Sequence, residues 1–387
     1  MSELLKLTSA LPDVVDSATA LHEAVQAIRE ASGPIAVDAE RAGSYRYSQR
    51  AYLVQVYRRG APVLLLDPIK FTDLSELGDV LAGDEWVMQA AHNDLECLEE
   101  IGLRPTRLFD TEVAAQLLGL QKVGLASLVE SQLGYEMRKS HGQADWSKRP
   151  LRRSWLEYAA LDVCALPDLQ EALAESLEDA GKTRWARQEF EHQMTRRQVS
   201  DPEDRWRRTN SAGRLRTDAQ RGALYRLWLH RDALARERDV AWHRILRDQV
   251  MVEMARQLPT TLDELSSVEK VPRTVIQQAR GWLDVIAQGA AEPVQRLERV
   301  DGPPARSIRA WEQRDPDAAA RWVALRQALT DRAEELHVWV QTLLAPDIVA
   351  DLAWAPPDDP AGRMAQLGAR PWQVENTRDI FEARADG

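Results

Sequence analysis

Cysteine is nearly absent from this 387-residue chain, which contains only Cys97 and Cys164. Two cysteines cannot build a disulfide framework or a cysteine-rich zinc site, so both are excluded as the basis of the fold. Long apolar runs are lacking too, since none approaches the roughly 20 residues that span a bilayer. Residues 1–17 have no basic start followed by an apolar stretch. We therefore expect no signal peptide, no membrane contact and a cytoplasmic location.

Lysine is scarce as well, with 7 residues against 43 arginines. The net charge of −11 argues mildly against nucleic acid as a partner, because phosphate binding depends on basic side chains. Two segments depart from this average, since residues 137–153 carry a net charge of +5 and residues 196–256 one of +6. Such local basic segments fit selective contact with phosphates, although a solvated helix surface would give the same count.

Short apolar runs in the first 170 residues or so predict an α/β domain. Strands rich in Val and Leu are expected at 34–40, 51–58, 61–68 and 85–91. Tight polar or Gly-containing breaks separate the first three, as in a meander. Helical patterns are expected at 73–83, 94–102 and 111–119.

From about Trp155 onward the pattern is helical almost to the end. An amphipathic stretch over 156–181 is interrupted by Pro167, which should kink or divide the helix. A long stretch rich in Arg and Glu follows at 182–208. The second half of the chain is therefore predicted to be all-α.

Residues 214–290 have the pattern of a compact helical unit, in which Thr261 and Glu264 have capping-box spacing. Residues 287–305 contain Pro and Gly and predict a linker. The block after it faintly repeats the middle unit in the order apolar helix, Pro-containing turn, second helix. These divisions predict three domains, at 1–200, 214–290 and 304–387.

The sharpest chemical signal is the pair Asp38 and Glu40 at the end of the first predicted strand. On a strand, residues i and i+2 share a face, so both carboxylates leave one side of an otherwise apolar strand. Burying two like charges is costly, and a divalent cation such as Mg²⁺ or Mn²⁺ would compensate them. Taken alone, however, an Asp-x-Glu pair is more often an exposed strand end or a turn.

Two further motifs carry acids. Asp94 lies just after the fourth predicted strand, where the dipole of a following helix would also favour an acid. His92 beside it would be a ligand, a base or simply structural. Tyr158 and Asp162 lie four residues apart and would share one face of a helix. In isolation, packing plus a hydrogen bond is the simpler explanation of that pair.

The order of these motifs is more informative than any one of them: Asp-x-Glu on a strand, Asp at a strand-to-helix junction, and Tyr-x-x-x-Asp on a helix. This order closely resembles the DEDDy branch of the 3′–5′ exonucleases, specifically the ribonuclease D family. The matching segments are IAVDAERAGSYRYSQRAYLVQV, HNDLECL, RLFDTEVAAQLLG, DWSKRPL and WLEYAALDVCAL. Residues 15–200 resemble the catalytic domain, and 214–290 resemble an HRDC domain, a small helical nucleic-acid-binding module. The last block resembles a second, divergent HRDC-like unit.

This resemblance implies an RNase H-like α/β/α exonuclease domain with a mixed sheet, followed by two small helical HRDC-like domains. It also implies two divalent metal ions, Mg²⁺ or Mn²⁺. Asp38 would contact both ions, and Glu40 and Asp162 would complete the site of the ion that activates water. Asp94, which we align with the family's acid in preference to the neighbouring Glu96, would hold the second ion. The hydroxyl of Tyr158, which is neutral near pH 7, would orient the attacking water.

The implied activity is 3′–5′ exoribonuclease hydrolysis, in stable RNA or tRNA 3′ processing or in RNA decay. The implied partner is the 3′ end of single-stranded RNA, tRNA precursors among the candidates, and no protein partner is predicted. Substrate contacts are expected from Arg46, Tyr47, Gln49, Arg50, Gln55, His92, Lys148 and Arg149. Trp146 would stack on a base or simply pack. Arginines from the helices that follow could funnel the strand: Arg205, Arg207, Arg208, Arg244 and Arg247. An ordinary polar surface would have a similar composition.

Two other functions fit part of the pattern. A 3′–5′ DNA exonuclease would use the same acids, and a contact with the 2′-OH would separate RNA from DNA. A non-catalytic HRDC-type nucleic-acid-binding protein would not need the full set of acids that the chain contains. The chain shows no polymerase or helicase signature and no Gly-rich phosphate loop of the Walker type. These absences favour a stand-alone RNA-processing enzyme.

Overall fold

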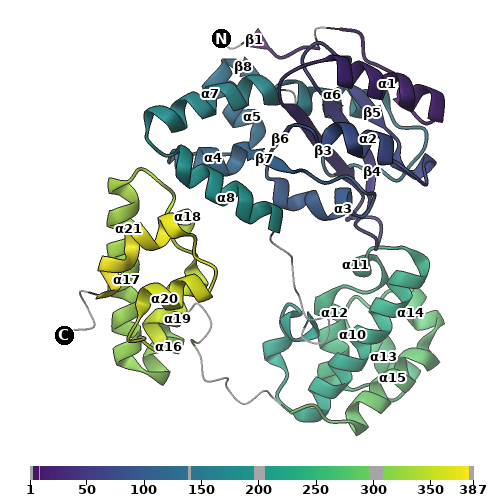
Figure 1. Ribbon diagram of the computed structural model, residues 1–387. Helices are drawn as coiled ribbons and strands as arrows, with labels where there is room; N and C mark the ends of the chain where they lie inside the picture. The colour runs from purple at the N-terminus through teal and green to yellow at the C-terminus, as the bar shows by residue number, and fades with distance from the viewer. Residues whose placement is uncertain are drawn as a thin grey trace.

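The computed structural model describes residues 3–7, 9–137, 141–195, 205–295, 303 and 308–382. Figure 1 shows an α/β domain, a middle helical region and a C-terminal helical region, which contain residues up to 195, 205–295 and 308–382 respectively. None of the described helices is long and apolar enough to cross a membrane. The predicted division into an α/β part and an all-α part is confirmed.

A mixed six-stranded sheet forms the centre of the α/β domain, in the order β2-β5-β4-β3-β6-β7. The strands are β2 (Val14–Val15), β3 (Ile35–Arg41), β4 (Ala51–Tyr57), β5 (Leu64–Leu66), β6 (Glu85–Met88) and β7 (Arg107–Asp110). The strands β3, β4 and β5 pair antiparallel, which confirms the predicted meander. The strands β2, β6 and β7 join in parallel and make the sheet mixed.

The predicted strand list is incomplete. It lacks β2 and β7, which have two and four residues and are too short for a periodicity to show. It also lacks a separate parallel pair, β1 (Glu3–Leu4) with β8 (Tyr135–Glu136). Such short segments become strands through the neighbour they pair with, which local sequence does not specify.

Helices surround the sheet. They are α1 (Ala18–Glu30), α2 (Ser75–Leu81), α3 (Leu95–Glu99), α4 (Thr111–Leu117), α5 (Leu125–Leu128), α6 (Arg153–Cys164), α7 (Leu166–Asp179) and α8 (Thr183–Thr195), with short turns η1 (Pro68–Lys70), η2 (Ala91–Asn93) and η3 (Val129–Leu133). Pro167 lies in the first turn of α7, where a missing N–H is tolerated. The predicted division of the 156–181 stretch at this proline is therefore confirmed.

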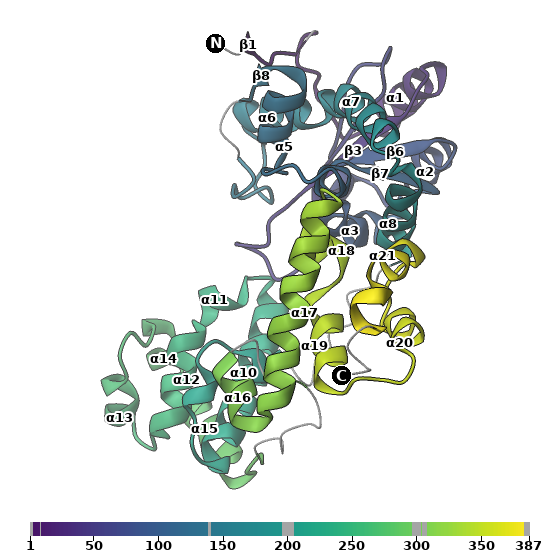
Figure 2. The ribbon, with the colours of Figure 1, turned by 90° about the vertical axis from the view of Figure 1, so that its left-hand side faces the viewer.

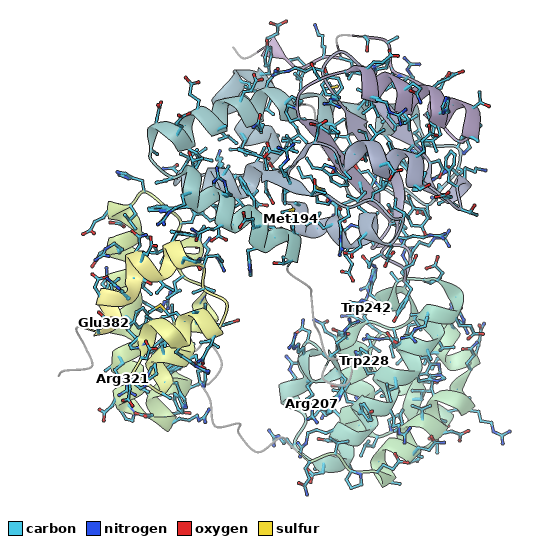
Figure 3. All side chains as sticks on the ribbon, viewed as in Figure 1. Met194, Arg207, Trp228, Trp242, Arg321 and Glu382 are labelled. Carbon is cyan, nitrogen blue, oxygen red and sulfur yellow. The ribbon has the colours of Figure 1, made fainter. Side chains whose placement is uncertain are left out.

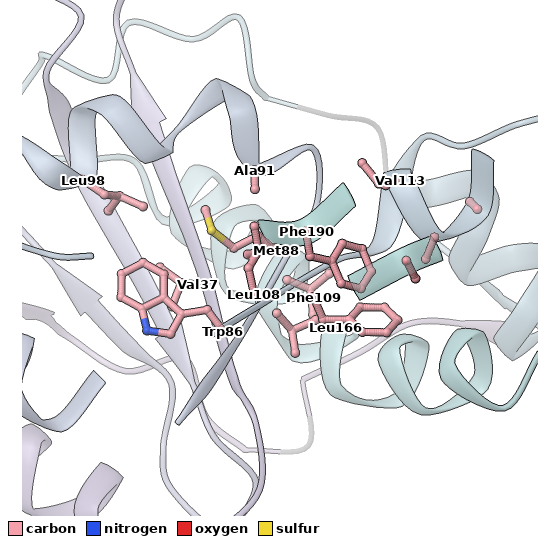
Figure 4. Close-up of a cluster of buried hydrophobic side chains, with 14 of the residues drawn as sticks. Val37, Trp86, Met88, Ala91, Leu98, Leu108, Phe109, Val113, Leu166 and Phe190 are labelled. Carbon is pink, nitrogen blue, oxygen red and sulfur yellow. The ribbon is translucent and has the colours of Figure 1, made fainter. Parts of the chain in front are cut away.

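A buried core joins the central strands to α7 and α8 (Figure 4). It contains Val37, Trp86, Met88, Leu108, Phe109, Leu166 and Phe190. The indole Nε1 of Trp86 donates a hydrogen bond of 2.8 Å to the carbonyl oxygen of Leu81, so even this polar atom is satisfied. Each large apolar side chain buried in this way contributes about 1.5–3 kcal/mol. This core holds β3 and β6 firmly beside one another.

The middle helical region contains η4 (Trp206–Arg208), η5 (Ala212–Arg214), α10 (Asp218–Arg238), α11 (Trp242–Ile245), α12 (Asp248–Gln257), α13 (Leu262–Ser267), α14 (Arg273–Gln277) and α15 (Ala279–Ala291). Thr261 and Glu264 form the predicted capping box, with both reciprocal hydrogen bonds present. The helices α10 and α15 pack so closely that a Cβ on Gly222 would lie 2.2 Å from the carbonyl oxygen of Gly289. Glycine is therefore required for this contact.

The start of the predicted linker is wrong, because α15 continues to Ala291. The segment 287–291 contains Gly289, and glycine was interpreted as a sign of loose chain. Here it serves close helix packing instead. Residues 296–302 and 304–307, which include most of the rest of the linker and the start of the third predicted domain, lie outside the described residues.

The C-terminal helical region contains α16 (Ile308–Arg314), α17 (Pro316–Glu335), α18 (Val340–Leu343), α19 (Pro346–Trp354), α20 (Pro360–Gln366) and α21 (Pro371–Glu382). Successive helices α17 to α21 have 20, 4, 9, 7 and 12 residues. In the middle region α10 to α15 have 21, 4, 10, 6, 5 and 13 residues, so α14 has no counterpart and the other five follow a similar order of lengths. This parallel supports the predicted repeat.

The two helical regions relate differently to the α/β domain. The middle region has an apolar cluster of its own, whereas the C-terminal region shares one continuous cluster with the α/β domain. Figures 1 and 2 both place α21 close to α8, and these helices are in contact. The C-terminal region is therefore packed as part of the α/β core.

Candidate active site

Two acids leave the same face of β3, as their spacing predicts. Asp38 lies opposite Gln55 of β4 and Glu40 opposite Leu53, so Asp38 and Glu40 share the face that α6 covers. The helix α6 brings Asp162 onto this face. Carboxylate oxygens of Asp38, Glu40 and Asp162 all lie within 4.8 Å of one another. The fold thus unites two motifs that are far apart in the sequence.

Asp94 reaches the same place from β6. Because β6 runs parallel to β3, the chain leaving β6 emerges beside the acids of β3. Asp94 is buried, and its side chain forms an ion pair with Arg41, with Nε and Oδ1 3.2 Å apart. Glu96, the other acid considered for this position, is exposed on α3. The geometry therefore favours Asp94 over Glu96 as the fourth acid of the site.

The turn that carries Asp94 is held by another buried acid, Asp110. The carboxylate of Asp110 accepts hydrogen bonds from the N–H groups of Ala90 and Ala91, at 3.1 and 2.8 Å. It also caps α4 by accepting from the N–H groups of Glu112 and Val113. One side chain thus ties the end of β6 to the start of α4.

The four acids line a cavity of about 820 Å³. Its walls include two loops: Gly43, Ser44 and Gln49 from the β3–β4 loop, and Gly142, Gln143 and Ala144 from the loop before α6. Tyr158 and Arg41 also line it. Among the described lining residues, Arg41 is the one permanent cation, so the cavity is strongly acidic.

The electrostatics of the cluster are unfavourable when all four acids ionise. Burial raises the pKa of Asp38 to about 6 and that of Asp94 to about 8. Burial, followed by repulsion from Asp38, Asp162 and Asp94, raises the pKa of Glu40 to about 10. The pKa of Asp162 is also raised well above its usual value, mainly by burial. Such a cluster takes up protons unless cations compensate its charge.

Tyr158 stands beside the cluster on α6. Its hydroxyl donates a hydrogen bond to the carboxylate of Asp162, which opposes the rise in the pKa of that acid. The ring meets that of His141 edge-on, with the ring centroids 5.8 Å apart. The helix spacing of four residues places both polar groups toward the cavity, so a neutral hydrogen-bonding group lies next to the acids.

Comparison with known protein families divides the chain in three. A model described as "3'-5' exonuclease" matches residues 12–178, "HRDC domain" matches 220–286, and "3' to 5' exonuclease C-terminal domain" matches 302–384. Ribonuclease D of Escherichia coli (strain K12) is 35% identical over 258 residues, covering 65% of this chain and 67% of that protein. Ribonuclease D of Jannaschia sp. (strain CCS1) is 31% identical over 339 residues, covering 84% of this chain and 85% of that protein. The chain belongs to the ribonuclease D family.

Solved structures agree with this membership of the ribonuclease D family. The structure of E. coli RNase D, described as an exoribonuclease involved in structured RNA processing, has a TM-score of 0.72 at 26% identity and covers 96% of this chain and 99% of its own. A protein from Bifidobacterium adolescentis has a TM-score of 0.87 at 30% identity over the full length of both chains. The predicted exonuclease fold with helical HRDC regions is confirmed, and this member of the ribonuclease D family is a 3′–5′ exonuclease and hence a hydrolase.

Exonucleases of this acidic type are typically metal-dependent, and the residues present in this ribonuclease D site fit a metal. Oxygen ligands suit hard divalent cations such as Mg²⁺ and Mn²⁺. Asp38, Glu40 and Asp162 offer three such oxygens in one group. Burial, followed by the neighbouring acids, raises the pKa of Glu40 to about 10, and Arg41 opposes this rise only in part.

The residues predicted to contact substrate in this ribonuclease D protein lie in different places. Gln49 lines the cavity, and its amide donates a 3.1 Å hydrogen bond to the carbonyl oxygen of Tyr47. Arg46 donates to the hydroxyl of Ser147 at 2.9 Å. Two exposed cations lie outside the cavity lining: Arg50, above the ring of Tyr52, and Lys148, near Asp145.

Three of the residues predicted to contact substrate do not line the cavity. Gln55 is fully buried. It pairs with Asp38 across β3 and β4, so its side chain lies on the same face of the sheet, which α6 covers. Arg149 is engaged with protein partners, donating to the carboxylate of Asp67 and to backbone oxygens, among them that of Tyr52. His92 is exposed and does not line the cavity, whereas Asn93 and Asp94 do. Trp146 is fully buried and packs 5.4 Å from Trp155 between ring centroids, which rules out base stacking.

Sequence reasoning missed Arg41. This residue follows Glu40 directly, but a strict alternation would point its side chain away from the acids. The register shifts between Glu40 and Arg41, where β3 has an irregularity, and the guanidinium reaches Asp94. The one sign of this ion pair in the sequence is a basic residue directly after the Asp-x-Glu motif.

Proposed function

We propose that this protein removes nucleotides one at a time from the 3′ end of single-stranded RNA in the cytoplasm. The hydrolysis would depend on two divalent ions, Mg²⁺ or Mn²⁺, held by Asp38, Glu40, Asp94 and Asp162. One observation carries the proposal: these four carboxylates, of which Asp38 is half-buried and the other three are buried, meet in one cavity that contains a single arginine among its described lining residues. That excess of negative charge is what a pair of divalent cations would neutralise.

The roles of the ligands follow from their positions. Asp38 lies at the centre, since its charge acts on Glu40, Asp94 and Asp162. It is therefore the residue that would contact both ions. Glu40 and Asp162 would hold one ion with it, and Asp94 the other. When bound, such ions supply Lewis-acid stabilisation of phosphoryl oxygens and a water of lowered pKa.

The chain's own groups would orient the reactants. Tyr158 already forms a hydrogen bond with Asp162, so its hydroxyl would position the attacking water. Arg41 would limit the freedom of Asp94 through their ion pair. Gln49 and the backbone of Gly43 and Ser44 form the wall that the terminal nucleotide would touch.

The choice of RNA over DNA rests on the relatives. E. coli RNase D is described as an exoribonuclease involved in structured RNA processing, and it matches almost the whole chain. Stable RNAs and tRNA precursors with extra 3′ residues are the substrates we favour. The domain limits 1–200, 214–290 and 304–387 remain part of the proposal.

The full-length protein should be incubated with 5′-labelled single-stranded RNA and with DNA of the same sequence, each with Mg²⁺, Mn²⁺ or EDTA. We expect stepwise shortening of RNA from the 3′ end with either metal and none in EDTA. DNA shortened as fast as RNA would favour the alternative of a DNA exonuclease. Binding without shortening under every condition would favour a non-catalytic binding protein.

Asp38→Asn is the decisive variant. It removes a charge from the centre of the cluster while keeping the side-chain volume, so we expect turnover to be lost and RNA binding and melting temperature to be retained. The matched control is Asp284→Asn, which changes an exposed acid of α15 and should leave turnover unchanged. A rate for Asp38→Asn close to that of the unaltered protein would refute the metal assignment.

A further inference from the structure

The loop between β3 and β4, residues 42–50, forms one wall of the acidic cavity. It contributes Gly43, Ser44 and Gln49 to the lining. It begins directly after Arg41, the partner of Asp94. Any displacement of this loop would therefore move both a wall of the cavity and a residue that holds one of the four acids.

The middle helical region holds the backbone of this loop. At the start of α11, the N–H of Ala241 donates a 3.1 Å hydrogen bond to the carbonyl oxygen of Tyr45. The Nε of Arg244 donates a 2.9 Å hydrogen bond to the carbonyl oxygen of Ser44, and its guanidinium lies 4.4 Å from the ring centroid of Tyr45. In Figures 1 and 3, α11 and the labelled Trp242 lie on the side of this region that faces the α/β domain.

Two acids of α10 and its C-cap hold the next part of the loop. The carboxylate of Asp239 accepts a 3.0 Å hydrogen bond from the N–H of Ser48 and lies 3.8 Å from the guanidinium of Arg46. The carboxylate of Asp232 accepts a 2.9 Å hydrogen bond from the hydroxyl of Tyr47. Asp239 itself has a left-handed backbone, with φ of 44°. The end of α10 is thus shaped to present its carboxylate to the loop.

Charge keeps this contact in place near neutral pH. Although burial acts to raise the pKa of Asp239, the hydrogen bond from the N–H of Ser48 and the charges of Arg46 and Arg50 hold it below its usual value. Asp232 also faces Arg236, which donates to its other oxygen. Asp239 is therefore ionised throughout the neutral range, so the contact does not depend on a protonation step.

The same loop is tied to the second wall of the cavity. The hydroxyl of Tyr45 donates to the carbonyl oxygen of Gln143 at 3.4 Å, and that of Ser44 donates to the side-chain oxygen of Gln143 at 3.3 Å. Arg46 reaches Ser147 in the same segment. A shift of the middle region would consequently be transmitted to both walls.

We propose that Asp239 and Asp232 are positioning residues, through which the middle helical region fixes the walls of the active site. The helical region would then control turnover even of substrates too short to reach it. This goes beyond a role in gripping RNA, although it rests on the proposed exonuclease function. A region that only gripped RNA would affect the affinity for long substrates and leave the shortest ones untouched.

The test compares a 5′-labelled RNA dinucleotide with a longer RNA, using the full-length protein. Asp239→Gly removes the carboxylate while keeping a residue that tolerates the left-handed backbone. We expect kcat on the dinucleotide to fall between about tenfold and a hundredfold, the effect of a misplacement of roughly 1 Å. Asp239→Asn keeps an oxygen that accepts from Ser48 and should recover part of the rate. Asp284→Ala, in the same region, should leave kcat unchanged.

Tyr47→Phe tests the second contact, because it removes the donor to Asp232 without touching the helices. It should lower the same kcat, with a melting temperature equal to that of the unaltered protein. Dinucleotide kcat unchanged in both Asp239→Gly and Tyr47→Phe would overturn the inference, whatever happens to longer RNA. If the unaltered protein shortens neither substrate, the proposed function fails instead, so the two failures are distinguishable.

Discussion

The carboxyl group of Glu40 shows how strongly position changes the chemistry of a residue. Burial and three neighbouring acids raise its pKa to about 10, while Arg41 opposes them only in part. The same residue on an exposed strand end would ionise near its usual pKa. The ionisation of Glu40 thus depends on its burial first and on the neighbouring acids second.

These raised pKa values predict how metal affects stability. In the metal-free protein, the folded state binds more protons than the unfolded state between the usual carboxyl pKa, near 4, and the raised values of about 6 to 10. The contribution of the cluster to stability therefore falls as the pH rises through that window. Bound metal removes the repulsion, so the rise in melting temperature with Mn²⁺ should be larger at about pH 8.5 than at about pH 6.

Thermal melts with and without Mn²⁺ at both pH values check this. Asp38→Asn serves as the control, and its metal-induced shift should be small at both. Equal shifts at the two pH values in the unaltered protein would contradict the link between the carboxyl cluster and metal binding.

Tyr158→Phe removes only the hydroxyl that donates to Asp162. If this group orients water, kcat should fall by roughly 10² or more, while the metal affinity changes little, because no ligand is lost. Steady-state kinetics and a Mn²⁺ titration separate the two effects. Tyr135→Phe, at an exposed tyrosine of β8, is the matched control and should leave both measurements unchanged. Unaltered kcat in Tyr158→Phe would remove this residue from the reaction.

At the scale of elements, the junction between β6, η2 and α4 depends on Asp110. This fully buried carboxylate accepts from the backbone of both η2 and α4. Burial raises its pKa to about 6 despite these donors. An N-cap is usually a local device, but here it also sets the position of the turn that carries Asp94.

Asp110→Ala should therefore have two effects. The loss of the cap and of the bonds to η2 should lower the free energy of unfolding by about 1–3 kcal/mol. The affinity for Mn²⁺ should also fall, because the turn that carries Asp94 loses its anchor. Urea unfolding and metal titration measure these quantities. The control is Asp315→Ala, which removes the side-chain cap of α17 and should cost about 1 kcal/mol without changing metal affinity. Intact metal affinity in Asp110→Ala would show that the turn is held by other contacts.

At the scale of the whole molecule, the C-terminal region is bound to the α/β domain by polar contacts as well as by a shared apolar cluster. The ammonium of Lys182 donates to the carbonyl oxygens of Leu117 and His337, at 2.7 and 3.0 Å. The indole of Trp339 donates to the carbonyl oxygen of Leu120 at 2.8 Å. The helix α4, which Asp110 caps, therefore ends against the C-terminal region.

A buried acid between the α/β domain and the C-terminal region predicts that these two parts unfold together. Glu189 of α8 accepts from Arg370 and from the indole of Trp372, both at 2.7 Å. Glu189→Ala removes the acceptor of the buried Trp372 indole and of the Nε of the half-buried Arg370, and should lower the free energy of unfolding by about 3 kcal/mol. Glu292→Ala, which removes the exposed partner of Arg226, should change it by less than about 1 kcal/mol. Urea unfolding followed by tryptophan fluorescence compares them, and equal effects would argue against a shared core.

Local patterns in the sequence determined a large part of this protein. The period of two on β3 put Asp38 and Glu40 on one face, and the spacing of four on α6 did the same for Tyr158 and Asp162. The capping box at Thr261 and the helix division at Pro167 were equally readable. Each of these depends only on backbone geometry within a few residues, which neighbours in the chain settle by themselves.

Only the tertiary structure decided which of these faces meet. The burial of Gln55, the engagement of Arg149 with Asp67 and the hold of Asp239 on the cavity loop all depend on segments distant in the chain. Polar residue types look alike in sequence whether they face solvent, a substrate or another domain. Their roles follow from the packing of helices on the sheet, because burial and long-range partners set their charge and reach.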